Sequence, residues 1–263
     1  MVPPFSETLL HWPAEAIWEA VWPKLPDFSV EILPTIDSTN SELMRRARAG
    51  QTDAVLLVAE SQSAGRGRLG RQWVSQRGDS LTFSLGMPLA PKDWSGLSLA
   101  VGLSLAESLH PQVGLKWPND LWIDGHKLGG ILIEVARLGG QSYVVIGVGL
   151  NIRTQAAEGL RTPPAALLDW LPGMTATEAL GRVAEPLVAA VQAFALSGFA
   201  PLQTRFHARD VLQGQEVSTS DGVHGLALGV DASGALQIET ATGVVSVHSS
   251  EVSVRPAAHQ EKI

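Results

Sequence analysis

The 263-residue chain contains no cysteine. This absence excludes disulfide bonds, thiol catalysis and zinc sites built on cysteine, and it is typical of proteins from a reducing compartment. The first residues do not combine a basic segment with a long apolar one, so we expect no secretory signal peptide. No uninterrupted apolar run reaches the ~20 residues that a membrane-spanning helix needs. The sequence therefore predicts a cytoplasmic protein with no membrane partner.

Positive charge is also scarce, because 19 lysines and arginines stand against 26 aspartates and glutamates, a formal net charge of -7. Nucleic-acid-binding domains are usually basic, so we expect no DNA partner. The seven histidines do not show the clustered spacing of metal ligands. The sequence also lacks the phosphate-binding pattern Gly-x4-Gly-Lys-Ser/Thr and the serine-hydrolase pattern Gly-x-Ser-x-Gly. Any nucleotide must therefore be held in another way.

The order of predicted elements favours an α/β (α+β) fold with two domains. We expect helices at residues 11–22, 39–49, 95–110, 165–170, 177–196 and 200–209. We expect strands at residues 30–33, 55–59, 80–87, 113–123 (interrupted at Pro118), 127–135 and 143–148, with a hairpin turn at residues 124–125. Thr39, followed by Glu42, suggests a capping box. Later segments at residues 216–219, 223–230, 235–239 and 244–247 alternate and are separated by glycine turns, which is typical of a small antiparallel barrel. We therefore predict domains at residues 1–210 and 211–263.

The most distinctive segment, residues 60–73, follows a predicted buried strand and combines glycine with arginine. Glycine allows positive φ angles and close approach to a ligand, and arginine offers a planar fork of donors for phosphate or carboxylate. The alternating residues are Gly65, Arg66, Gly67, Arg68, Gly70 and Arg71, followed by Trp73. The spacing formally matches a dinucleotide-binding turn, but the residues after it are unsuited to the helix which that turn requires. A loop that binds an anion through side chains is favoured over this turn and over an ordinary surface loop.

Two lysines stand beside predicted strand ends. Lys116 opens the run Lys-Trp-Pro-Asn-Asp at residues 116–120, where an ordinary turn would explain the residues equally well. In the functional interpretation, Lys116 contacts phosphate and Asp120 binds a metal or positions a nucleophile. Lys127 precedes two glycines, and glycine within a strand often marks the close approach of a ligand. An exposed hairpin lysine is the alternative interpretation of Lys127.

Glycine and polar side chains meet again at Gly147, Gly149 and Asn151, after another buried strand. Asn151 could reach a ligand or simply cap the turn. Most tryptophans belong to cores and interfaces. Trp73 and Trp117 are possible exceptions, because both lie within candidate anion-binding segments and could stack on flat rings.

The order and spacing of these motifs, from about residue 30 to residue 255, closely resemble those of bacterial biotin–protein ligases. The resemblance implies a catalytic domain related to class II aminoacyl-tRNA synthetases, with a mixed and largely antiparallel sheet, followed by an SH3-like C-terminal domain. It implies a reaction in two steps. Biotin and ATP first form biotinyl-5′-AMP and pyrophosphate, and the biotin then passes to one lysine of a biotin carboxyl carrier domain of acetyl-CoA carboxylase or a related carboxylase.

The resemblance also implies roles for individual residues. The expected catalytic residues are Arg68, Lys127 and Lys116. Biotin would be bound by Ser38, Thr39, Asn40, Gln62, Gly65, Arg66, Arg68 and Lys127. ATP would be bound by Arg68, Arg71, Trp73, Lys116 and Asn151, and Asp120 would help to hold Mg2+. Cations suit this chemistry because a carboxylate must attack the α-phosphorus of ATP, which brings two anions together.

Further expectations concern partners and regulation. The stretch before Ile32 is too short for the winged-helix domain that some members carry, so we expect no operator binding and no repressor activity. A homodimer through a sheet edge is compatible with the family. Residues 63–77 are predicted to be mobile without ligand and to shield the adenylate once it forms. The alternatives are a lipoate–protein ligase or octanoyltransferase, a biotin sensor without catalysis, and a nicotinamide-dependent oxidoreductase.

Overall fold

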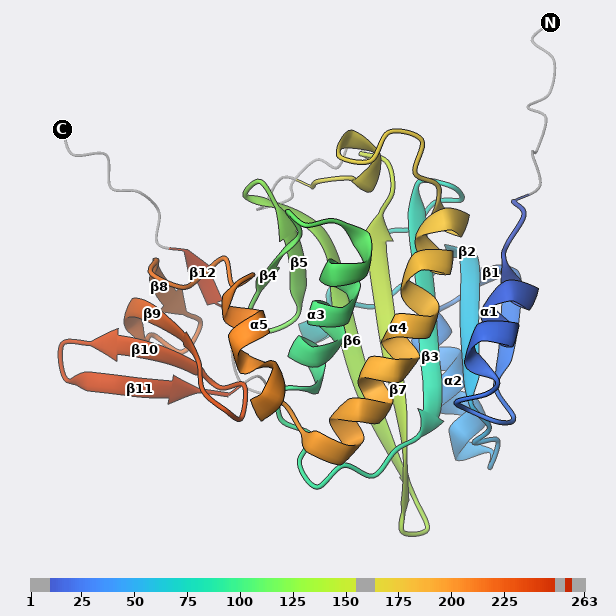
Figure 1. Cartoon of the computed structure of the whole chain (residues 1–263), viewed down its shortest axis with the longest axis horizontal. Helices are drawn as coiled ribbons and strands as arrows, with labels where there is room; N and C mark the ends of the chain where they lie inside the picture. Colours follow the sequence, from blue (N-terminus) through green and yellow to red (C-terminus); the bar gives the residue numbers. More distant parts are fainter. Residues whose placement is uncertain (1–9, 155–163, 249–253, 257–263) are drawn as a thin grey trace, which may run out of the picture.

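The computed structural model describes residues 10–154, 164–248 and 254–256. Within these residues the chain forms a seven-stranded sheet flanked by helices on both faces and a separate five-stranded sheet near the C-terminal end (Figure 1). The α/β (α+β) prediction is therefore confirmed.

The large sheet is mixed and has the strand order β1-β2-β3-β7-β6-β5-β4. Only β1 and β2 run parallel, because the helix α2 connects them, and every other neighbouring pair is antiparallel. The strands are β1 (Ser29–Ile36), β2 (Val55–Gln62), β3 (Ser80–Pro88), β4 (Gly114–Lys116), β5 (Asp120–Ile123), β6 (His126–Leu138) and β7 (Gln141–Asn151). A cis peptide bond at Pro118 separates β4 from β5, at the interruption that the sequence predicts.

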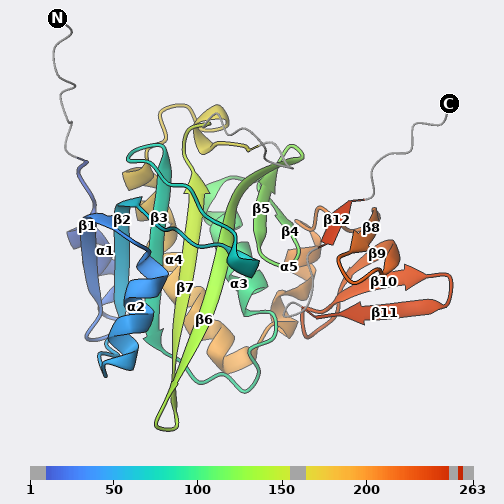
Figure 2. The same cartoon turned by 180° about the vertical axis from the view of Figure 1, so that it is seen from behind.

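Helices cover the two faces of this sheet unequally. One face carries α1 (Ala14–Val21), α3 (Leu97–Leu109) and α4 (Ala176–Ser197), whereas α2 (Thr39–Arg48) lies on the other face (Figures 1 and 2). By length and mean hydropathy, α4 could cross a membrane. Its apolar residues Val183, Leu187 and Val191 are buried, however, and it packs against α3 as a core helix does.

The start of α2 differs from the prediction in its cap. Ser38 is the N-cap, and its hydroxyl accepts a hydrogen bond from the Ser41 amide. The predicted capping box of Thr39 and Glu42 is wrong, because the helix begins one residue earlier and Glu42 instead pairs with Arg45 and with a second arginine. Placing Thr39 at the first helical turn directs it and its neighbour toward the sheet, where both are buried.

The remaining elements lead into the C-terminal sheet. The segment predicted as helix at residues 165–170 contains a short 3-10 turn, η2 (Leu167–Asp169), and residues 200–209 contain η3 (Ala200–Leu202) and α5 (Gln203–His207). The antiparallel strands that follow are β8 (Glu216–Thr219), β9 (His224–Val230), β10 (Leu236–Thr240), β11 (Gly243–Val247) and β12 (Val254–Pro256). The sequence did not predict β12. The SH3-like topology and the domain boundary at residue 211 stay predictions.

Candidate functional site

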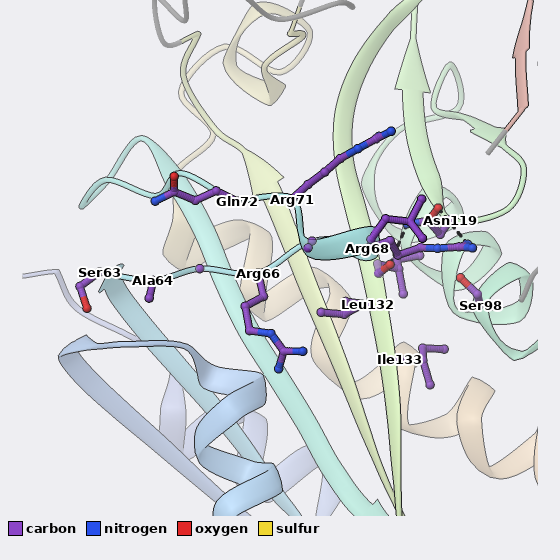
Figure 3. A pocket seen from close by; sticks show the side chains of 15 residues that line it. Ser63, Ala64, Arg66, Arg68, Arg71, Gln72, Ser98, Asn119, Leu132 and Ile133 are labelled. Carbon is purple, nitrogen blue, oxygen red and sulfur yellow. Dashed lines mark hydrogen bonds between the residues drawn. The ribbon is translucent and has the colours of Figure 1, made fainter. Parts of the chain in front are cut away.

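The loop of glycines and arginines between β2 and β3, which contains η1 (Arg68–Gly70), forms the rim of a cleft of about 690 Å3 (Figure 3). The opposite wall comes from α3, from Asn119 and from β6. The lining residues are Ser63, Ala64, Gly65, Arg66, Gly67, Arg68, Leu69, Gly70, Arg71, Gln72, Ser98, Asn119, Ile131, Leu132 and Ile133. The cleft thus brings together Gly65, Arg66, Arg68 and Arg71 of the predicted site.

Backbone hydrogen bonds fold the loop into a narrow hairpin. The Gly67 amide donates to the Arg71 carbonyl over 2.7 Å, and the Trp73 amide donates to the Gly65 carbonyl over 2.9 Å. Leu69 at the tip has a φ of 56°, in the left-handed region. The arginine side chains consequently leave the loop in different directions (Figure 3).

Arg68 points across the cleft, and one of its guanidinium nitrogens, Nη1, lies 3.4 Å from Asn119 Oδ1 (Figure 3). Burial lowers the pKa of the Arg68 guanidinium, the negative charge of Asp120 raises it, and the positive charge of Arg71 lowers it again. A half-buried cation beside a second cation is stabilised when an anion arrives. This part of the cleft is therefore suited to a carboxylate or a phosphate.

A buried polar network lies under the root of the loop, where α2 begins. The side-chain oxygen of Gln62 accepts hydrogen bonds from the Thr39 amide at 2.8 Å and from its hydroxyl at 3.2 Å. Ser84 Oγ on β3 lies 2.7 Å from Thr39 Oγ1 and 2.6 Å from Asn40 Oδ1. Ser38, Thr39 and Asn40 are each at most 3% exposed. The structure thus brings together the predicted residues for the polar end of a ligand.

Glycines form a floor beside this network, on the α2 face of the sheet. Gly130 of β6 and Gly149 of β7 are directly opposite each other. A Cβ atom at Gly149 would lie only 2.6 Å from Cζ2 of Trp73, so the indole rests directly on the strand backbone. The indole Nε1 of Trp73 is buried and has no hydrogen-bond partner among the described residues. A flat ring can approach a strand this closely only where the side chain is absent.

Lys127 and Asp120 form a second charged group next to the floor. Lys127 Nζ lies 2.7 Å from Asp120 Oδ1, and a Cβ atom at Gly130 would touch both side chains. The Lys127 side chain thus folds back over the backbone of Gly130 at ordinary contact distance. Within the described residues, no group of three or more His, Cys, Asp or Glu side chains could hold a metal ion.

Lys116 and Trp117 lie outside the main cleft. Lys116 is 8% exposed, and its ammonium group lies 4.2 Å from the centre of the Trp122 ring. Lys116 and Trp122 line a smaller cleft of about 290 Å3 with Gly114, Val211 and Gln215, among others. The interpretation of Trp117 as a stacking platform for a ligand is wrong. It is 1% exposed, and its indole Nε1 donates to the carbonyl of Gly234 in the turn before β10.

Asn151 ends β7 and serves a structural contact. Its amide nitrogen donates to the carbonyl of Ala165 over 3.1 Å and lies 3.4 Å from the carbonyl of Lys127. This side chain ties the start of β6 to the segment after residue 163. Its position beside the Lys127 backbone is compatible with the predicted role, which stays a prediction.

Sequence reasoning missed three polar residues of the site, namely Ser84, Asn119 and Glu134. Asn119 Nδ2 donates to the Ile131 carbonyl, and Glu134 accepts hydrogen bonds from Arg66 and Asn40. Asn119 and Glu134 stand within segments that the sequence singled out, so their position was a usable signal. Ser84 carries no such signal, because only the register of β3 against β2 and β7 places it beneath α2.

Comparison of the chain with known proteins identifies its family. Residues 32–151 match the biotin/lipoate A/B protein ligase family, and residues 214–255 match the biotin protein ligase C-terminal domain. The chain is 34% identical to the biotin–[acetyl-CoA-carboxylase] ligase of Mycobacterium tuberculosis, over 85% of this chain and 88% of that protein. It is also 34% identical to the bifunctional ligase/repressor BirA of Escherichia coli, over 87% of this chain and 75% of that protein.

A solved structure agrees with these matches. The biotin protein ligase of Aquifex aeolicus in complex with biotin and ATP superposes with a TM-score of 0.74, at 28% identity, over 87% of this chain and 99% of that one. The two family matches span the candidate site and most residues of both sheets. The resemblance of the motifs is thereby confirmed, and the chain belongs to the biotin–protein ligase family.

Proposed function

We propose that this enzyme is an ATP-dependent biotin–protein ligase. It joins biotin to ATP as biotinyl-5′-AMP and then transfers biotin to one lysine of the biotin carboxyl carrier domain of acetyl-CoA carboxylase or a related carboxylase. One observation carries the proposal: a buried polar network and a glycine floor lie beneath a loop rich in arginine. The polar network of Thr39, Asn40, Gln62 and Ser84, which we call the biotin seat, can bind the polar end of a ligand. The arginines of the loop can bind the carboxylate of that ligand.

The polar network defines which chemistry the seat can recognise. Thr39, Asn40 and Gln62 present hydroxyl and amide groups that are already fixed, Thr39 by Gln62 and both Thr39 and Asn40 by Ser84. Fixed donors and acceptors bind a ligand with little loss of side-chain entropy. A cyclic urea, which has two N–H donors and one carbonyl acceptor, matches such a seat, and the ureido ring of biotin has this chemistry.

The cations serve the adenylation step. The biotin carboxylate attacks the α-phosphorus of ATP, a bond forms between that oxygen and phosphorus, and pyrophosphate leaves. Arg68, with Arg71 beside it, supplies positive charge where the two anions meet, in a half-buried setting that strengthens the interaction. The reaction is also accelerated because both reactants are held in position on one rigid sheet.

Lys127 reaches the reacting carboxylate by exchanging its partner. In the ligand-free arrangement, its ammonium group is paired with Asp120 at 2.7 Å. The ligand carboxylate would take the place of Asp120, which then becomes available as an oxygen ligand. Such a carboxylate fits Mg2+, which is commonly held by one or two carboxylates together with nucleotide phosphates and water. When bound, Mg2+ would neutralise phosphate charge, and Asp120 is the protein residue that would hold it.

Lys116 lies in the smaller cleft, stacked on Trp122. The predicted contact between Lys116 and phosphate therefore requires the lysine to reach over from this cleft, or the nucleotide to extend toward it. Trp73 covers Gly149 at the position where a second flat ring could stack. We propose that Lys116, Trp73 and Asn151 contact ATP, as the sequence predicts.

Biotin-dependent exchange of labelled pyrophosphate into ATP tests the proposed function. We expect exchange that requires biotin, does not occur with lipoate, and falls by roughly a hundredfold or more in Arg68→Ala. An Arg205→Ala variant provides a matched control, because it removes an arginine that pairs with Glu107 outside the described cleft. Saturable biotin binding without exchange would instead support a sensor, and exchange with lipoate would support a lipoate ligase.

Other expectations stay predictions. The absence of repressor activity requires a DNA-binding assay, since the E. coli relative is named as both a ligase and a repressor. The homodimer through a sheet edge requires sedimentation analysis with and without biotin and ATP. The cytoplasmic location requires fractionation of the native cells.

A further inference from the structure

Glu134 of β6 is a charged residue whose two oxygens are both used within the site. Its Oε1 accepts a hydrogen bond from Arg66 Nη2 at 3.0 Å. Its Oε2 accepts one from Arg66 Nη1 at 3.2 Å and another from Asn40 Nδ2 at 3.0 Å. One carboxylate thus joins the anion-binding loop to the polar network at the start of α2.

The Asn40 amide is held in a single orientation by these contacts. Its nitrogen donates to the Leu132 carbonyl at 3.1 Å as well as to Glu134, which uses both of its hydrogens. Its oxygen lies 2.6 Å from Ser84 Oγ and fills the space above Gly147. An amide whose two donors are occupied can offer a ligand only an acceptor, and Glu134 is one of the two groups that enforce this orientation.

Arg66 is turned away from the other loop arginines. Its guanidinium points toward α2, whereas Arg71 and Arg68 point elsewhere (Figure 3). Besides its two contacts with Glu134, it lies 3.3 Å from the Ser41 hydroxyl. A parallel, two-point contact between arginine and carboxylate fixes orientation as well as distance. Arg66 therefore anchors one side of the narrow loop that Gly67 and Arg71 close.

We propose that Glu134 is a positioning residue that couples the anion-binding loop to the biotin seat. It does so through Arg66 on the loop and Asn40 in the seat. This inference rests on the proposed function, and it assigns to Arg66 an anchoring role in place of the predicted contact with biotin. An alternative is that Glu134 merely occupies Arg66 until a ligand displaces it. The additional bond to Asn40 argues against that alternative. Displacing Glu134 would also break its hydrogen bond to Asn40 and so disturb the polar network that is proposed to bind biotin.

The coupling has a kinetic consequence. Removing the charge of Glu134 releases Arg66 and weakens the hold on Asn40, so the loop opens more often and the seat loses its orientation. We expect KM for biotin to rise by about tenfold or more, because ligand binding must then order both parts. We expect kcat of the exchange reaction to change much less, because Arg68 and Lys127 are untouched.

The experiment combines hydrogen exchange with kinetics on the full chain. Amide exchange of the peptide covering residues 65–73 reports loop opening without any need for activity, through the two backbone hydrogen bonds that close the loop. In Glu134→Gln we expect this peptide to exchange about tenfold faster and KM for biotin to rise with little loss of kcat. The matched control is Glu107→Gln, which removes a two-point contact with Arg205 elsewhere and should change neither quantity.

A charge exchange gives the second test. The double variant Arg66→Glu with Glu134→Arg restores the pair across the same gap, so we expect loop protection to return while KM for biotin stays high, because Asn40 has lost its acceptor. Unchanged loop exchange and unchanged KM in Glu134→Gln would overturn the proposal. Wild-type protein without biotin-dependent pyrophosphate exchange would refute the proposed function instead, and the hydrogen-exchange result would still decide whether Glu134 anchors the loop.

Discussion

Gly147 offers a direct test of whether the polar network and the glycine floor form one seat. In Gly147→Ala the new methyl carbon would lie well inside van der Waals contact of Asn40 Oδ1 and only 2.8 Å from its Cγ. Asn40 is 3% exposed and cannot swing into solvent without breaking its contacts with Leu132, Glu134 and Ser84. The backbone of Gly147 has no positive φ, so the substitution acts through this collision alone.

The expected loss of stability in Gly147→Ala follows from the hydrogen bonds that the new methyl group would break. Displacing Asn40 breaks two to three buried hydrogen bonds at about 1 kcal/mol each, and overpacking by a methyl group costs about 1–3 kcal/mol. Part of this cost is relieved by local movement, so we expect the free energy of unfolding to fall by about 2–4 kcal/mol. The affinity for biotin should fall with it, because the displaced amide no longer faces the ligand.

Urea denaturation and isothermal titration with biotin measure the two effects. Gly181→Ala in α4 is the matched control, because its new methyl group would meet only Pro13, at an ordinary 3.6 Å, and the helix should gain up to about 1 kcal/mol. Weakened biotin binding in Gly147→Ala with a stable fold would locate the ligand at this network. An unchanged free energy of unfolding together with unchanged biotin affinity would refute the placement of Asn40 over Gly147.

Three further predictions concern other parts of the molecule. Trp117→Phe keeps a buried aromatic ring but loses the hydrogen bond to Gly234 and leaves a small cavity, so thermal unfolding should show a loss of at least about 1–2 kcal/mol; unchanged stability would exclude this bond as a link between the two sheets. Burial raises the pKa of Asp210 to about 6 from 3.8, so its carboxylate lowers stability above pH 6 and has no such effect below pH 4. Asp210→Asn should therefore stabilise the protein by about 1–3 kcal/mol at pH 7.5 and hardly at pH 4, as urea titrations at both pH values would show; an equal gain at both would contradict the assignment. Biotin with ATP should protect residues 63–77 from proteolysis, and equal cleavage with and without ligand would count against closure of the loop.

The elements of the fold could be predicted because local patterns agree with the tertiary structure. Alternation and buried apolar runs located β2, β3, β6 and β7, and the turn at residues 124–125 joins β5 to β6 as expected. Local patterns failed where the contact partner decides the structure. The segment after Ala200 divides into a 3-10 turn and a short helix, and β12 depends on pairing with β8 rather than on its own residues.

The site shows the same division between local and long-range information. Gly65, Arg66, Arg68 and Arg71 stand in one short segment, so the sequence could group them. It could not show that Arg66 turns toward α2, because that direction is set by Glu134, 68 residues further along the chain. The sequence therefore shows that a loop contains an arginine, but it does not show whether that arginine binds a ligand or anchors the loop. That role depends on the strand register, which decides whether a carboxylate partner lies within reach.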